Sequence, residues 1–264
     1  MRLFLLAANV LAPALAAWAW WRGQGWWALA GIFAVHMLTL WATLWPRCRW
    51  WGPQLLEMDT AEKEVWLTID DGPDPEDTPV LLDALDAHGA KATFFLIGEK
   101  AARWPELARE IARRGHMVGN HTMTHPQYAF WRLGPRALAR ELDLASSTLR
   151  DILGEEPALF RAPAGMRNFF LHPLLRARGL PLIGWSARGL DGHDTDRERI
   201  LRRVLRGVRP GAILLLHEGK RDAAGRPLAQ DCVPRLLEEL RARGYRSRAL
   251  PAAFSAPHPA EAPK

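Results

Sequence analysis

Residues 64–73 read Glu-Val-Trp-Leu-Thr-Ile-Asp-Asp-Gly-Pro, and they give the strongest indication of the fold. Its β-branched and aromatic side chains at 64–69 predict a strand, which stops at a polar turn carrying two adjacent carboxylates. Side chains that follow one another in a strand point to opposite faces, so Asp70 and Asp71 should have different roles. Because like charges this close repel, we expect them to share a proton or a cation. A polar turn that only starts the next helix is the alternative.

Working outward, predicted strands alternate with predicted helices to the end of the chain. Further strands are predicted at 91–97, 116–120, 158–161, 180–186, 212–217 and 245–250. Helices are predicted at 79–88, 104–114, 135–153, 171–178, 196–206 and 233–243. This alternation is typical of parallel β/α units. Seven strands favour a barrel, complete or incomplete, over a flat sheet.

Polar residues gather where the predicted strands end. In β/α folds the active site lies at the carboxyl ends of the strands. The residues at these ends are Asp70, Asp71, His121, His125, Arg161, Trp185, Asp191 and His217. Five strand ends with ionisable groups are hard to explain by packing alone, so we expect an active site there.

His121 and His125 are spaced as metal ligands often are. Four residues apart on one helical turn, two histidines share a face and can bind one metal. With an aspartate as third ligand they form the open three-ligand site that holds a catalytic zinc. Solvated loop histidines are the alternative. His217, which ends an apolar strand, is a candidate general acid or a structural histidine.

These motifs together resemble the NodB-type polysaccharide deacetylases, carbohydrate esterase family 4, over roughly residues 64–250. Residues 68–73 (TIDDGP) are similar to the family's TFDDGP, and 121–125 (HTMTH) to its H-(S/T)-x-x-H. Residues 161–165 (RAPAG) resemble its RxPxG, and 215–217 (LLH) its LxH. Four motifs in the family's order make the resemblance specific.

The resemblance implies a deformed (β/α)7–8 barrel with one divalent metal, Zn²⁺ first, with Co²⁺, Ni²⁺ or Mn²⁺ as other options. It implies Asp71, His121 and His125 as its ligands. Asp70 would be the general base and His217 the general acid. The remaining implied site residues are Arg161, which would hold Asp70; Asp191, which would tether Arg161; and the substrate contacts Pro163, Gly165, Trp185 and Leu215.

One motif departs from the family's pattern. After the fifth predicted strand the family often carries Asp-x-x-Asp-Trp, where this chain has Arg188 and Gly192 around Asp191. The missing Trp argues against the binding of a long polymer and favours a smaller or lipid-linked sugar as the substrate. Arg188 would meet a phosphate or carboxylate, or else cap a carbonyl or pair with an acid. We therefore expect a hydrolase that removes an acetyl or formyl group from an amino sugar of a glycolipid, lipid-linked sugar or envelope polysaccharide. The alternative is a non-catalytic, membrane-tethered glycan-binding protein.

The first 51 residues differ from the rest of the chain. Apolar stretches at 3–21 and 26–45 are each close to the roughly 20 residues that span a bilayer, and nine of the 13 tryptophans fall in residues 18–51. Tryptophan is typical of membrane interfaces. We expect a transmembrane hairpin at 1–51, a deacetylase domain at 60–253 and a disordered tail at 254–264. A signal peptide cleaved near residue 16 and a buried helix pair remain alternatives.

Charge adds a weak indication of location and partners. Arg2, Arg47 and Arg49 lie on one side of the hairpin and only Arg22 in its turn, which favours a cytoplasmic domain at a bacterial inner membrane. The net charge of +6 suits membrane lipids or a phosphate-bearing substrate, or reflects an Arg-rich proteome. We expect no nucleic-acid partner. The two cysteines have no metal-site spacing.

Overall fold

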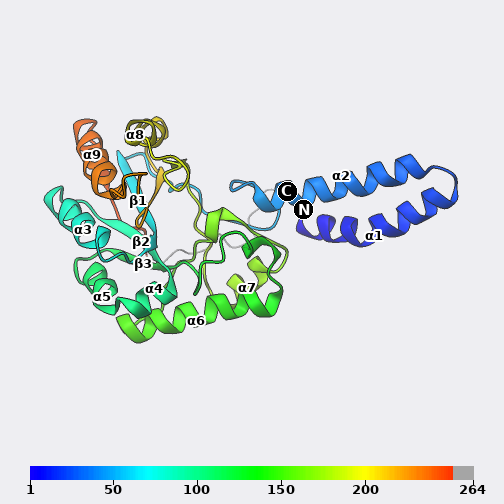
Figure 1. Ribbon diagram of the computed structural model, residues 1–264, viewed down its shortest axis with the longest axis horizontal. Helices are drawn as coiled ribbons and strands as arrows, with labels where there is room; N and C mark the ends of the chain where they lie inside the picture. Colours follow the sequence, from blue (N-terminus) through cyan, green and yellow to red (C-terminus); the bar gives the residue numbers. More distant parts are fainter. Residues whose placement is uncertain (252–264) are drawn as a thin grey trace.

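The chain folds into an α/β domain with a helical hairpin projecting from its side (Figure 1). The structure, a computed structural model, describes residues 1–251. The tail predicted to be disordered, 254–264, lies outside this part. The hairpin consists of α1 (Arg2–Trp21) and α2 (Gly25–Leu44). Its two spans agree closely with the predicted apolar stretches.

A parallel sheet forms the centre of the domain. Its strand order is β3-β2-β1-β5-β4, and β6 pairs with the start of β1. All residues of β2, and all but the first of β1, are buried. Burial on both faces explains why these strands read as continuous apolar runs. The strands are β1 (Glu64–Gly72), β2 (Ala92–Leu96), β3 (Met117–Asn120), β4 (Ala187–Arg188), β5 (Ile213–His217) and β6 (Arg246–Ser247).

The pairing continues beyond both edges of this sheet and closes on itself. Asn120 at the end of β3 bridges to Phe160, and Phe160 bridges to Leu182. The segment that carries Leu182 runs on into β4, which pairs with β5. The ladder therefore forms the predicted deformed barrel, open in places.

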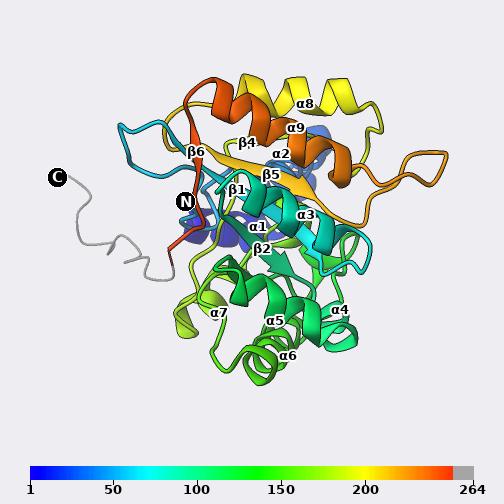
Figure 2. The ribbon, with the colours of Figure 1, turned by 90° about the vertical axis from the view of Figure 1, so that its left-hand side faces the viewer.

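Helices cover this barrel on opposite sides. Figure 2 shows α8 and α9 on one side of the strands and α5 and α6 on the other. The helices of the domain are α3 (Asp77–Ala87), α4 (Gly98–Arg103), α5 (Pro105–Arg113), α6 (Pro135–Leu153), α7 (Leu171–Ala177), α8 (Arg197–Arg206) and α9 (Ala229–Ala242). Short 3-10 turns lie at Phe130–Arg132 and Pro163–Gly165. The largest apolar cluster packs between β1, β2 and β5 and the helices α3, α8 and α9.

Two predicted strands are not regular strands. Residues 158–161 and 180–186 contribute isolated bridges only, and β4 begins just after them at Ala187. Pro157 and Pro181 border or interrupt these segments, and proline has no N–H to give to a ladder. The prediction also missed α4, a six-residue helix that starts at a glycine and has too few apolar positions to show a period.

The hairpin is not a buried helix pair. Both helices are long and apolar enough to cross a membrane, and most of their apolar side chains are exposed. One polar contact joins them, between Asn9 Nδ2 and Thr39 Oγ1 at 2.8 Å. A signal peptide passes the same test of length and apolar composition. The alternative of a peptide cleaved near residue 16 therefore concerns α1 and leaves α2 in place.

The base of the hairpin docks on the domain. Arg167, which is fully buried, donates to the backbone carbonyls of Trp45 and Cys48, and its own N–H donates to the carbonyl of Thr43 at 3.2 Å. Trp51 donates to Thr43 Oγ1 at 3.2 Å and packs edge-on against Phe169. The loop that follows Arg161 therefore holds the end of α2.

Candidate active site

The end of β1 turns two neighbouring carboxylates into one pocket. The register of β1 against β2 shifts between Asp70 and Gly72, and Asp71 has a φ of 72°. A regular strand would point the two side chains to opposite faces. The bulge instead lets both Asp70 and Asp71 line the same pocket, each with different partners.

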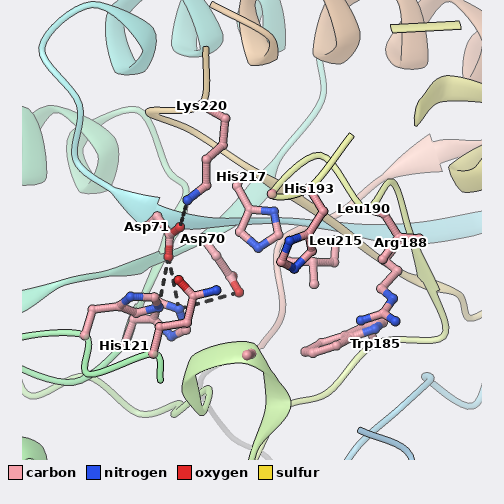
Figure 3. A pocket seen from close by; sticks show the side chains of 14 residues that line it. Asp70, Asp71, His121, Trp185, Arg188, Leu190, His193, Leu215, His217 and Lys220 are labelled. Atoms are coloured by element: carbon pink, nitrogen blue, oxygen red, sulfur yellow. Dashed lines mark ion pairs between the residues drawn. The ribbon is translucent and has the colours of Figure 1, made fainter. Parts of the chain in front are cut away.

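Asp71 meets both histidines of the predicted metal site. Its Oδ1 lies 3.4 Å from His121 Nε2 and 3.2 Å from His125 Nε2. The three potential ligand atoms all lie within 4.8 Å of one another. Figure 3 shows Asp70, Asp71 and His121 pointing toward one another at one end of the pocket.

The two histidines do not share a helical turn, which corrects the prediction. Residues 121–125 form an irregular loop in which Thr122 and His125 have φ of 70° and 51°. Glu141 of α6 holds this loop by accepting from the backbone N–H of Met123 and Thr124. The backbone carbonyl of Arg161, 2.9 Å from His121 Nδ1, fixes that ring and leaves its Nε2 for the site.

The donor set fits a divalent cation. Oδ1 of Asp71 is buried and has no hydrogen-bond partner within the described chain. Burial lowers the pKa of His125 to about 3, so this ring is neutral as a ligand must be. Burial alone would raise the pKa of Asp71, but the facing imidazole rings, that of His121 first, hold it well below its usual range. An ionised carboxylate facing two imidazole nitrogens is a zinc-type donor set.

Arg161 engages Asp70, as predicted. It is fully buried, and its Nη1 donates to Asp70 Oδ1 at 2.8 Å and to Thr68 Oγ1 at 2.6 Å. Its Nη2 donates to the carbonyl of Gly184 at 2.8 Å. These bonds, with one from Nε to the carbonyl of Ile183, fix Arg161 and so hold Asp70 Oδ1 in place. The other oxygen, Asp70 Oδ2, lies 3.8 Å from His121 Nε2.

Asp191 binds His217 and not Arg161, so the predicted tether was wrong. Its Oδ1 lies 2.9 Å from His217 Nδ1, and its Oδ2 accepts from the backbone N–H of His217 at 2.7 Å. Burial would lower the pKa of His217, but the charge and hydrogen bond of Asp191, with Asp70 and Asp71, raise it to about 9. His217 is therefore protonated at neutral pH.

Two of the four residues predicted to contact the substrate line the pocket, and the other two do not. Trp185 and Leu215 line the pocket, whereas Ala164 lines it in place of its neighbours Pro163 and Gly165. A side chain at Gly165 would come within 2.6 Å of the Trp185 ring, so this glycine lets the indole pack closely.

Several wall residues were not predicted. Lys220 places Nζ 2.7 Å from Asp71 Oδ2, and Gln127, Leu190 and His193 also line the pocket. They stand in loops whose path the sequence pattern does not give. The one feature of the sequence that could have indicated Lys220 is its position three residues after His217, which ends β5.

A family model described as polysaccharide deacetylase matches residues 57–182. A chitooligosaccharide deacetylase of Bradyrhizobium sp. (strain ANU 289) is 37% identical over 201 residues, covering 73% of this chain and 91% of its own. A peptidoglycan-N-acetylglucosamine deacetylase of Bacillus cereus is 33% identical over 193 residues, covering 72% of this chain and 68% of its own.

Solved structures show the same fold. A peptidoglycan N-acetylglucosamine deacetylase in complex with a substituted benzamide matches with a TM-score of 0.68 and 29% identity, covering 76% of this chain and 92% of its own. A family 4 carbohydrate esterase from Streptomyces lividans in complex with acetate matches with a TM-score of 0.63 and 30% identity, covering 72% and 93%. A mutant pseudoenzyme of that family with restored enzymatic activity matches with a TM-score of 0.66 and 26% identity, covering 74% and 68%.

Proposed function

Because the chain belongs to the polysaccharide deacetylase family, and so to the carbohydrate deacetylases, we propose that it hydrolyses the N-acyl group of an amino sugar. One observation carries the proposal. Asp71, His121 and His125 converge on one point, and Asp70 and His217 line the same pocket. A base, an acid and a three-ligand metal site in one pocket are what amide hydrolysis by this route requires.

Asp71, His121 and His125 would hold the divalent cation. One carboxylate and two imidazoles suit Zn²⁺ and leave a coordination position open. Co²⁺, Ni²⁺ and Mn²⁺ accept the same ligand types. When bound, the cation supplies Lewis acidity that activates water and polarises the acyl carbonyl.

Asp70 and His217 move the protons in the proposed reaction. Asp70 accepts a proton from the attacking water through the oxygen that Arg161 leaves free. The water oxygen bonds to the acyl carbon, and the C–N bond of the resulting tetrahedral centre then breaks. His217 donates its Nε2 proton to the departing amine, since Nδ1 faces Asp191. The products are a carboxylic acid and a free amino sugar. Trp185 and Leu215 would enclose a small acyl group, acetyl or formyl.

The hairpin supports a membrane-linked substrate. Two exposed apolar helices stand beside the domain, with tryptophans exposed near their turn and at the domain end. We place the protein at a bacterial inner membrane with its domain on the cytoplasmic side, following the arginine distribution. The substrate would be a glycolipid, a lipid-linked sugar or a nascent envelope polysaccharide. A reporter fused to the C-terminus tests the side.

A non-catalytic glycan-binding protein is the second candidate. It is favoured by the altered segment around Arg188 and Gly192, and by the fold's occurrence in a pseudoenzyme. The retained base, acid and ligand residues favour catalysis.

Purified full-length protein should bind one metal per chain and release acetate from a chitooligosaccharide. Asp70→Asn should keep the metal and lose turnover by a factor of at least about 100, the range of general base catalysis. A fully active Asp70→Asn variant would contradict the assigned base. Mass spectrometry of envelope glycolipids, with wild-type or Asp70→Asn protein expressed, should show one acyl-mass difference on the natural substrate.

A further inference from the structure

The pocket has a cationic end opposite the metal site. Arg188 lines the pocket beside Trp185, with its guanidinium carbon 5.9 Å from the centre of the indole ring. Figure 3 shows Arg188 and Trp185 across the pocket from Asp70, Asp71 and His121. A substrate that reaches from the metal site along the pocket would therefore pass Arg188.

A second arginine joins Arg188 from the base of the hairpin. Arg47 stands three residues after the end of α2 and donates from Nη2 to the backbone carbonyl of Ser186, two residues before Arg188. Both arginines are exposed residues. Partial burial and the neighbouring charge of Arg47 lower the pKa of Arg188. Arg47 and Arg188 therefore lie where the base of the hairpin meets the pocket.

This pair has no counterion within residues 1–251. Neither Arg47 nor Arg188 appears among the ion pairs within 4.0 Å, although other arginines around the barrel, such as Arg178, Arg197 and Arg221, pair with carboxylates. An anion at this place would meet two guanidinium groups that no carboxylate within residues 1–251 neutralises.

We propose that Arg47 and Arg188 form a phosphate site for the substrate, which would then be an N-acylated sugar phosphate. The inference rests on the proposed function and names its substrate class. A guanidinium offers a planar fork of N–H donors that matches phosphate oxygens in pairs. The acyl amide occupies the metal end and the phosphate occupies the arginine end. Because Arg47 stands three residues after the end of α2, a lipid on that phosphate would leave the pocket along the hairpin.

The test compares a charged with an uncharged substrate on the full-length, metal-loaded protein. The charged substrates are N-acetylglucosamine 1-phosphate and the same sugar phosphate carrying a short prenyl chain, presented in detergent micelles. The uncharged substrate is a chitooligosaccharide. The measured quantity is the ratio of kcat/KM for each charged substrate to that for the chitooligosaccharide, in wild type, Arg188→Gln, Arg188→Lys and Arg47→Gln. Arg49→Gln is the matched control, since it removes the same charge two residues from Arg47, and Arg47 is the one of the two that is hydrogen-bonded to the segment of Arg188.

We expect Arg188→Gln to lower this ratio about 10- to 100-fold, the range for a lost hydrogen bond to a charged group. Arg188→Lys should lower it less, and Arg49→Gln should leave it unchanged. Titration of a short prenyl phosphate into the metal-free protein should show the same order of affinities. A drop with the prenyl compound alone identifies a lipid-linked phosphate, and a drop with both compounds a phosphate from either source.

An unchanged ratio in Arg188→Gln and Arg47→Gln, with the chitooligosaccharide still hydrolysed, overturns the phosphate site and leaves the proposed function standing. Loss of hydrolysis of every substrate in wild type overturns the proposed function itself. The two failures are therefore distinct.

Discussion

Asp191 contacts His217 at two points, the imidazole ring and the backbone N–H. One carboxylate oxygen lies 2.9 Å from Nδ1 and the other accepts from the main-chain N–H at 2.7 Å. A carboxylate on Nδ1 sets the ring orientation and keeps the proton of the other nitrogen aimed at the pocket. It also favours the imidazolium, which a general acid needs.

Asp191→Asn should shift the alkaline limb of the pH–rate profile to lower pH. His217 acts in its protonated form, so activity through it is present below its pKa and is lost as pH rises through about 9. Without the carboxylate, that pKa should fall toward or below the ordinary value near 6.5. The measurement is kcat between pH 5 and 10. An unmoved alkaline limb would show that another group is the acid.

Removing a metal ligand should abolish both binding and turnover. His121→Ala deletes one of three ligands, and its Nδ1 partner, the Arg161 carbonyl, loses its contact too. We expect metal affinity to drop by more than the 10- to 100-fold typical of supporting residues. Metal content after dialysis and acetate release check this. His193→Ala, a pocket histidine outside the ligand group, is the control and should retain its metal.

Arg161→Met should destabilise the domain more than the double change with Asp70→Asn. Removing one partner of a buried ion pair leaves a lone charge and costs about 3–5 kcal/mol. Neutralising Asp70 as well removes that charge and should restore part of the loss. Thermal unfolding of the three variants in one detergent measures it. If the single and double variants melt at the same temperature, the unpaired charge on Asp70 is not the source of the lost stability.

Glu218→Gln should flatten the dependence of stability on pH. Burial, with the charges of Asp77 and Asp74, raises the pKa of Glu218 to about 8, despite a 2.5 Å hydrogen bond from Thr78. The pKa of Glu218 in the folded state exceeds its unfolded value of 4.5. The contribution of Glu218 to the free energy of unfolding is therefore fully present below about pH 4.5 and is lost as the pH rises through 8. Melting temperatures at pH 5, 7 and 9 test this. The control Glu239→Gln, half-exposed on α9, should keep the wild-type slope.

The order of the elements and a set of candidate site residues could be predicted from the amino-acid sequence. Apolar runs and glycine breaks follow from local propensities and period, so the spans of α1, α2 and α6 could be predicted closely. Motif spacing was enough to select Asp70, Asp71, His121, His125 and His217, because ligand chemistry restricts the residue types.

How these residues meet could not be predicted from the sequence and is seen only in the folded chain. The bulge that turns Asp71 beside Asp70, the irregular loop of His121 and His125, and the pairing of Asp191 with His217 depend on contacts between segments far apart in the chain. The meeting of Arg47 with the strand of Arg188 spans 139 residues between donor and acceptor. Such contacts leave no local period, because they are set by how the barrel closes and where the hairpin docks.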